Sequence, residues 1–217
     1  MLEIKKRFLN LQNEENAKNM KAYMKNNFEF LGIRTAERRK VQKEEFKKIP
    51  KDAEIDKEFV RNLWNEEFRE FQYAALDYLI KMRKKLKKDD ILFIEELIRN
   101  KPWWDTIDPI SSYLVGEICK NYPEVIDTYI IKWIEDENFW IRRSSIIFQL
   151  KYKEKTNTNI LEKAIKFNIN EKEFFIRKAI GWALREYSKT NKNWVSDFVK
   201  NNDMSGLSKR EASKYLD

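Results

Sequence analysis

Three segments of the chain align with one another at separations of 70 and 35 residues. They begin at Phe71, Ile141 and Ile176. Small residues recur at one place in each segment, where neighbouring helices would need a close approach: Ala74, Ser144 and Ala179. A period near 35 residues with two helices in each unit is typical of helical repeat proteins, whose stacked units bury one continuous core. The sequence therefore predicts an all-α fold, an α-solenoid of HEAT-like helical repeats.

Glycine and proline, the residues that most often interrupt regular structure, are scarce. The 217 residues include 4 Gly and 4 Pro, with 42% hydrophobic and 37% charged residues, and this composition favours helices throughout. Hydrophobic periodicity places helices at about residues 12–27, 35–48, 55–65, 68–85, 90–100, 108–121, 123–134, 138–152, 158–168, 173–188, 191–201 and 207–215. No long linker separates these segments, so we expect one domain over residues 1–217.

The residue types that are missing restrict the chemistry. The sequence has no histidine, which is the usual general base and the commonest metal ligand. Its single cysteine, Cys119, excludes an intramolecular disulfide and a multi-cysteine zinc site. Any reaction must therefore use carboxylates, cations, aromatic rings or hydroxyls.

The charge balance and the N-terminus bear on partner and compartment. Lys and Arg number 44 against 36 Asp and Glu, which gives a net charge of +8. A surplus of this size is compatible with a nucleic-acid partner, although much of it is an ordinary solvated surface. The first residues contain no apolar signal core and no stretch approaches a membrane span, so a cytoplasmic protein is expected.

One stretch, residues 101–109, departs from the ordinary helical pattern. It reads Lys-Pro-Trp-Trp-Asp-Thr-Ile-Asp-Pro, with two tryptophans, two carboxylates and two prolines. In a structural interpretation, Asp108 caps a helix that starts at Pro109, and Trp103 and Trp104 wedge the preceding loop against a core. A functional interpretation depends on where Asp108 falls in the repeat.

Asp108 shares its repeat position with a tyrosine and two cations. In the 35-residue register one slot holds Tyr73, Asp108, Arg143 and Lys178. Trp104 lies one turn before Asp108, and Trp182 lies one turn after Lys178. Solenoids gather such positions on a concave face, so we expect a functional site there. The alternatives are a solvated groove edge and a Trp182 that belongs to the core.

These residues fall within segments that resemble a known family. Lys-Pro-Trp-Trp-Asp-Thr-Ile-Asp at 101–108 resembles the signature of the AlkD-type DNA alkylation repair proteins, which are HEAT-like-repeat DNA glycosylases. Similar segments occur at residues 30–39, 139–150, 174–187 and 207–214, so the resemblance covers nearly the whole chain.

The resemblance implies removal of cationic N3- and N7-alkylated purines from double-stranded DNA by a monomer, without a metal ion or cofactor. It also implies that the lesion stays in the helix instead of being flipped into a base pocket. The family's catalytic aspartate falls on Asp108, and its two sugar-flanking tryptophans fall on Trp104 and Trp182. Its cleft arginine falls on Arg143, and the concave face becomes the expected DNA-binding face.

The same chemistry can be argued from the residues. A purine alkylated at N3 or N7 is already cationic, so it can leave without a protonated general acid, and the absence of histidine is no handicap. Positive charge then develops on the deoxyribose. A carboxylate about 4 Å away would stabilise that charge by roughly 4 kcal/mol at an effective dielectric constant near 20. It can also orient or deprotonate the attacking water, and tryptophan faces attract a cationic sugar.

Cations beside the carboxylate would hold the DNA backbone. Arg143 is expected to hold a phosphate bidentately, and Lys178 and Arg142 are further DNA-binding candidates. Two other classes of function stay open. A non-catalytic HEAT-repeat module could bind damaged or distorted DNA, although an anion facing phosphates would weaken binding. A protein-interaction scaffold, a common use of solenoids, would show no preference for damaged DNA.

Overall fold

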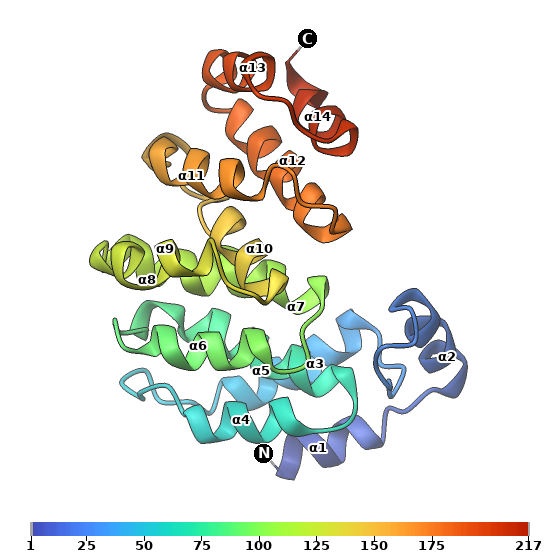
Figure 1. Ribbon diagram of the computed structural model, residues 1–217. Coiled ribbons are helices and arrows are strands. Elements are labelled where there is room, and N and C mark those ends of the chain that lie inside the picture. Colours follow the sequence, from blue (N-terminus) through green and yellow to red (C-terminus); the bar gives the residue numbers. More distant parts are fainter. Residues whose placement is uncertain (1, 217) are drawn as a thin grey trace. The chain divides into compact units, whose positions relative to one another are not determined.

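The computed structural model describes residues 2–216, and all regular secondary structure within that range is helical (Figure 1). An isolated parallel bridge joins Glu29 and Phe68. The predicted all-α fold class is confirmed, whereas the concave DNA-binding face stays a prediction. The chain divides into two compact units, one up to Lys85 and one from Leu86 onward.

The first unit is built from short helices around a small apolar core. Its helices are α1 (Leu2–Leu9), α2 (Glu14–Tyr23), α3 (Thr35–Phe46), α4 (Lys57–Asn65), α5 (Arg69–Met82) and the 3₁₀ turn η1 (Arg83–Lys85). Helices α4 and α5 pack together, and α3 contacts both α1 and α5. The fully buried carboxylate of Glu70 accepts hydrogen bonds from the backbone N–H groups of Leu31, Gly32 and Ile33. These bonds satisfy a loop that has no helical partners of its own.

The second unit contains the remaining helices. They are α6 (Asp90–Arg99), α7 (Trp104–Pro109), the π-helix η2 (Ile110–Val115), α8 (Gly116–Asn121), the π-helix η3 (Ile126–Ile130), α9 (Ile131–Trp133), α10 (Phe139–Ile147), η4 (Lys153–Lys155), α11 (Thr158–Asn168), α12 (Phe174–Ser188), α13 (Lys192–Asn201), α14 (Gly206–Ala212) and η5 (Ser213–Tyr215). In Figure 1 the pair of α11 and α12 is followed by the pair of α13 and α14. Helix α12 packs against α10, α13 and α14, so it is the element on which the site is assembled.

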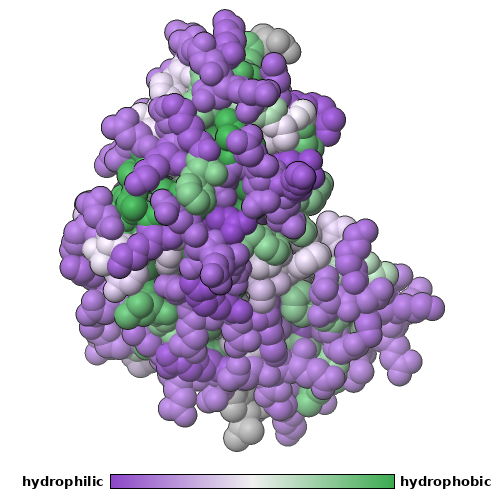
Figure 2. Space-filling model, in the orientation of Figure 1, coloured by the Kyte–Doolittle hydropathy of each residue, from purple (hydrophilic) through white to green (hydrophobic). Residues whose placement is uncertain are grey.

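Surface and core are separated as expected for short amphipathic helices. Hydrophilic side chains cover most of the face seen in Figure 2, and hydrophobic residues form smaller patches among them. Within the second unit a buried cluster runs from Ile134 through Ile146, Ile176 and Leu184 to Ala212. No helix in residues 2–216 is long and apolar enough to span a membrane.

The helix predicted near the N-terminus is present but shorter than expected, and the helix before it was missed. A single helix was expected over residues 12–27, but the structure has α1 before it and a shorter α2 from Glu14 to Tyr23. Asn13 separates the two because its side chain accepts a hydrogen bond from the N–H group of Asn16, which caps α2. Lys25 and Asn26 both have positive φ angles, which ends α2 before residue 27.

The predicted helix start at Asp108 was also wrong. Helix α7 begins at Trp104, after an extended Trp103 whose carbonyl accepts from the N–H groups of Thr106 and Ile107. Pro109 therefore lies inside the helix, where it cannot donate a backbone hydrogen bond. The chain continues as the π-helix η2, a wider turn that accommodates this interruption. Asp108 is thus a residue within a helix, and its carboxylate is not required as a cap.

Candidate functional site

A cavity of about 360 Å³ within the second unit brings most of the predicted site residues together. Five of its lining residues were predicted from the sequence: Trp104, Asp108, Arg143, Lys178 and Trp182. They come from α7, α10 and α12, three helices that follow one another in the stack. Three of the four residues that share the repeat slot, Asp108, Arg143 and Lys178, line this cavity, whereas the fourth, Tyr73, belongs to the first unit.

Asp108 and Arg143 form a two-point ion pair at one wall of this cavity. Arg143 Nε donates to Asp108 Oδ1 at 2.8 Å, and a terminal nitrogen of the same guanidinium donates to Oδ2 at 2.9 Å. The other terminal nitrogen donates to the carbonyl oxygen of Phe175 on α12. The side chains of Arg143 and Asp108 are only 5% and 17% exposed, so the pair is largely shielded from water. Arg143 thereby fixes the direction of the Asp108 carboxylate.

Two buried hydroxyls hold α7 and α10 in register around this pair. The single hydroxyl hydrogen of Ser111 is shared between the carbonyl oxygen of Ile107, 2.6 Å from the hydroxyl oxygen, and the hydroxyl oxygen of Ser144, 2.9 Å from it. Ser144 in turn donates to the carbonyl oxygen of Trp140 at 3.0 Å. Because Ser144 directly follows Arg143, this chain of hydrogen bonds ties the residue beside the guanidinium to the helix that carries Asp108.

Burial and charge act on Asp108 in opposite directions. Burial raises the pKa of Asp108 above the ordinary value of 3.8, because the charged form loses hydration. The positive charge and hydrogen bonds of Arg143 lower the pKa, and the nearby negative charge of Asp105 raises it. The net direction is upward. Arg143 is therefore the group that keeps a partly desolvated carboxylate ionised.

The adjacent tryptophans have separate roles. Trp104 lines the cavity. Trp103 packs instead against Trp140 and Phe175, with ring centroids 5.7 and 5.1 Å apart. Its indole Nε1 is buried, and no hydrogen-bond partner for it occurs within residues 2–216. The structural interpretation, a wedge against a core, thus holds for Trp103, while Trp104 belongs to the site.

Trp182 and Lys178 lie on one side of α12. Trp182 is half-buried, packs on the apolar core of the second unit and also lines the cavity. Lys178 is 38% exposed and its ammonium lies 3.2 Å from Glu211. The two interpretations of Trp182 are therefore not exclusive, because the side chain both packs against the core and lines the cavity.

Arg142 lies outside this cavity and has a structural use. Its guanidinium donates to the side chains of Asn168 and Glu171 at 3.0 and 2.7 Å, and to the carbonyl oxygens of Asp136 and Glu137. These bonds connect the loop before α10 with the end of α11. A contact between Arg142 and DNA stays a prediction that this geometry does not favour.

The sequence interpretation missed half of the lining residues: Phe174, Phe175, Arg185, Glu211 and Lys214. Arg185 could have been found, because it follows Lys178 by seven residues, which is two helical turns on the same face. Glu211 and Lys214 come from the C-terminal helix α14 and the turn after it, and no spacing rule connects them with α12.

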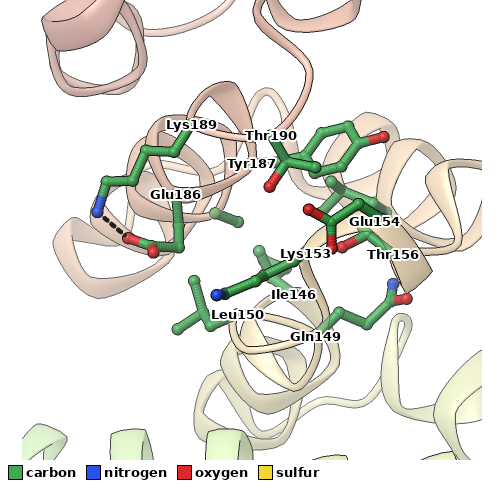
Figure 3. A pocket seen from close by; sticks show the side chains of 12 residues that line it. Ile146, Gln149, Leu150, Lys153, Glu154, Thr156, Glu186, Tyr187, Lys189 and Thr190 are labelled. Carbon is green, nitrogen blue, oxygen red and sulfur yellow. Dashed lines mark hydrogen bonds and ion pairs between the residues drawn. The ribbon is translucent and has the colours of Figure 1, made fainter.

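A second cavity of the same unit, of about 300 Å³, contains none of the predicted site residues. It lies where the end of α10 meets the end of α12, over Ile146 and Leu150 (Figure 3). Glu186 and Lys189 at its rim pair with each other at 2.6 Å. The described residues also contain no group of three His, Cys, Asp or Glu side chains placed to hold a metal ion.

Comparison with known proteins identifies the family. The sequence model of the family described as DNA alkylation repair enzyme matches residues 4–216. The chain belongs to the DNA alkylation repair enzyme family. No protein with a curated description matches it. The family resemblance predicted from residues 101–108 is confirmed, and with it a role in DNA alkylation repair.

Solved structures agree with this family. The chain is similar to a predicted DNA alkylation repair enzyme from Enterococcus faecalis, with a TM-score of 0.86 and 36% identity over 94% of this chain and 96% of that one. It has the fold of AlkD2 from Streptococcus mutans, with a TM-score of 0.63 and 18% identity over 93% of this chain and 99% of that one. The structure of smu.31 from Streptococcus mutans UA159 has a TM-score of 0.62 and 19% identity, over 84% and 92% of the two chains.

Proposed function

We propose that this member of the DNA alkylation repair family is a DNA glycosylase that releases cationic N3- and N7-alkylated purines from double-stranded DNA. The observation that supports this most is the buried pair of Asp108 and Arg143 beside Trp104 and Trp182 in one cavity. A carboxylate held by a single arginine in a cavity that two indoles also line is suited to a developing cation. For phosphate binding alone, the same carboxylate would be unfavourable.

The substrate itself explains why no general acid is needed. Alkylation at N3 or N7 leaves the purine positively charged. When the bond between C1′ and the base breaks, its electron pair goes to the base, which leaves as a neutral molecule. The positive charge moves to the deoxyribose, and a water molecule then adds at C1′ and loses a proton. The only charge that the protein must stabilise is therefore on the sugar.

Asp108 provides that stabilisation. The effective interaction of its carboxylate with a charge about 4 Å away is roughly 4 kcal/mol at a dielectric constant near 20. Arg143 fixes both carboxylate oxygens in place, so little reorganisation is needed during the reaction. The remaining lone pairs of Asp108 can orient the attacking water and accept its proton.

The indoles and cations complete the proposed site. Trp104 and Trp182 place electron-rich ring faces near the sugar cation and keep bulk water away from it. Arg143 has five N–H groups, and Asp108 and Phe175 use three of them, which leaves two for a phosphate oxygen. Lys178 and Arg185 line the same cavity and supply further positive charge. We propose that the protein acts as a cytoplasmic monomer, as one domain and without a metal ion or cofactor.

Release of free base separates this proposal from its alternatives. The protein, in excess over a duplex with one 7-methylguanine, should liberate 7-methylguanine in a single turnover, while an undamaged duplex of the same sequence should release no guanine. Free base is measured by chromatography. Tight binding of the damaged duplex without release would favour the non-catalytic HEAT-repeat binder. Equal, weak binding of both duplexes would favour a protein scaffold.

A further inference from the structure

Glu211 is an almost buried carboxylate surrounded by three cations at the edge of the cavity. It is 7% exposed. Its oxygens lie 3.2 Å from the ammonium of Lys178, 2.7 Å from a terminal nitrogen of Arg185 and 3.0 Å from the ammonium of Lys214. Because these contacts are charge-assisted, they lower the pKa of Glu211, beginning with the hydrogen bond from Lys214. The carboxylate therefore stays ionised over the neutral pH range.

The packing of α14 on α12 is built around this carboxylate. Gly181 of α12 faces it, and a Cβ atom at position 181 would lie 2.5 Å from the Cβ of Glu211 and 3.0 Å from the carbonyl oxygen of Ser208. Only a residue without a side chain allows α14 to come this close. The hydroxyl of Ser208 then donates to the carbonyl oxygen of Arg177 at 3.0 Å, which holds the two helices together on the same side.

The placement of Glu211 relates it to Trp182. Lys178 precedes Trp182 by four residues and Arg185 follows it by three, so the two cations are its neighbours along one face of α12. A single carboxylate, reaching across Gly181, binds both of them. The two helix-face neighbours of Trp182 thus share one anchor on another helix.

An anion at this point is unfavourable for simple attraction of DNA. Lys178, Arg185 and Lys214 would attract phosphates more strongly without a negative charge among them. Attraction of DNA alone therefore gives no use for a carboxylate that the close packing of two helices buries.

We propose that Glu211 is a positioning residue of the site: it holds Lys178 and Arg185 on the two sides of Trp182 and so fixes the indole that faces the reacting sugar. This inference rests on the proposed glycosylase function and assigns a catalytic consequence to the C-terminal helix. Glu211 does not itself touch the sugar. Its negative charge weakens the attraction of the site for DNA, but it keeps the indole and the two cations in a fixed arrangement.

The test compares Glu211→Gln with a matched control, Glu186→Gln. Both substitutions remove one carboxylate from a residue that pairs with a lysine, but Glu186 lies at the far end of α12, in the other cavity (Figure 3). Single-turnover release of 7-methylguanine at saturating protein and affinity for undamaged duplex are measured for each variant, together with thermal stability. In Glu211→Gln, release should fall about tenfold, within the range caused by small displacements of positioned groups. Affinity should rise about threefold, because three cations lose their internal counter-charge.

The two readouts distinguish positioning from a merely structural role. Loss of packing alone would lower release and affinity together with thermal stability. That result, or release equal to that of Glu186→Gln, would overturn the proposal. Inactivity of the unmodified protein on 7-methylguanine would instead overturn the proposed function and this role with it.

A second variant displaces Glu211 without removing its charge. In Gly181→Ala the added methyl group must push Glu211 and α14 away from α12. Release should fall as in Glu211→Gln, but affinity should not rise, because the negative charge of Glu211 remains near the cations. A folded Gly181→Ala variant with unchanged release would contradict the proposal.

Discussion

Replacing Asp108 by asparagine removes one charge from the centre of the proposed site and leaves its shape nearly unchanged. The carboxylate is 17% exposed, which places it in the regime where an effective dielectric constant near 20 applies. At about 4 Å from the sugar the lost attraction is roughly 4 kcal/mol, which corresponds to a rate about a thousandfold lower. Arg143 would also keep its positive charge without a counter-charge 2.8 Å away, and it would oppose the sugar cation. A thousandfold loss is therefore a lower estimate.

The structure changes the expected effect of this variant on stability. From the sequence, the substitution would simply have exchanged one helix-capping side chain for another, with folding nearly intact. Because Asp108 instead pairs with an almost buried arginine, the variant should lose about 1.5–3 kcal/mol, the range for a hydrogen bond to a charged group. Release must therefore be expressed per folded molecule, with the folded fraction determined by thermal unfolding.

The assay is single-turnover release of 7-methylguanine from a duplex, with binding measured in parallel. Asp108→Asn should bind the duplex as tightly as the parent or more tightly, because an anion near the phosphates is gone. Asp105→Asn is the matched control, since Asp105 belongs to the same helix but does not line the cavity. Near-parental release by folded Asp108→Asn would refute the catalytic assignment.

Trp104→Ala and Trp182→Ala should each slow release of the base more than they weaken binding of the duplex. Loss of a buried aromatic side chain would instead lower the free energy of unfolding by roughly 3–5 kcal/mol. A variant that is destabilised to this extent but releases base normally per folded molecule would show that its tryptophan has only a structural role. Arg143→Ala should shift the acid limb of the release rate to higher pH. The sign follows from the pair: Arg143 lowers the pKa of Asp108, so its removal raises that pKa further and leaves more Asp108 protonated at a given pH. An unshifted limb would contradict the pairing. The same variant should bind damaged and undamaged duplex more weakly. The slope of log affinity against log salt concentration should decrease by about one, as expected for one lost phosphate contact. An unchanged slope would show that Arg143 does not contact a phosphate.

The sequence was sufficient for the fold class, and it brought together residues that line one cavity of the structure. Scarce glycine and proline with helical periodicity predicted an all-α chain. The 35-residue register placed Asp108 and Arg143 in one slot, and the structure joins them directly. The same spacing separates Arg38 and Tyr73 in the first unit, where the guanidinium lies 5.0 Å from the ring centroid. Residues 35 positions apart can therefore contact each other directly, in addition to lying on the same face of successive repeats.

Local rules failed where tertiary contacts overrode them. The pair Asp108–Pro109 has the pattern of a helix start, but packing and the carbonyl of Trp103 begin the helix one turn earlier. The bidentate partner of the Arg143 guanidinium was not predictable either, because such a partner can be a phosphate or a carboxylate. Only the structure shows that the partner is the carboxylate of Asp108. Glu211 lies beyond any register, since its contacts depend on how closely α14 approaches Gly181.

The central claim is that the protein stabilises charge on the sugar and relies on a base that is already cationic. Its most direct test is the ratio of single-turnover release rates for two bases at one position of the same duplex, 7-methylguanine and a neutral damaged purine such as 8-oxoguanine. The account predicts rapid release of 7-methylguanine and no detectable release of the neutral base, because the proposed mechanism includes no protonation of the leaving base. Comparable rates for the two bases would contradict the account.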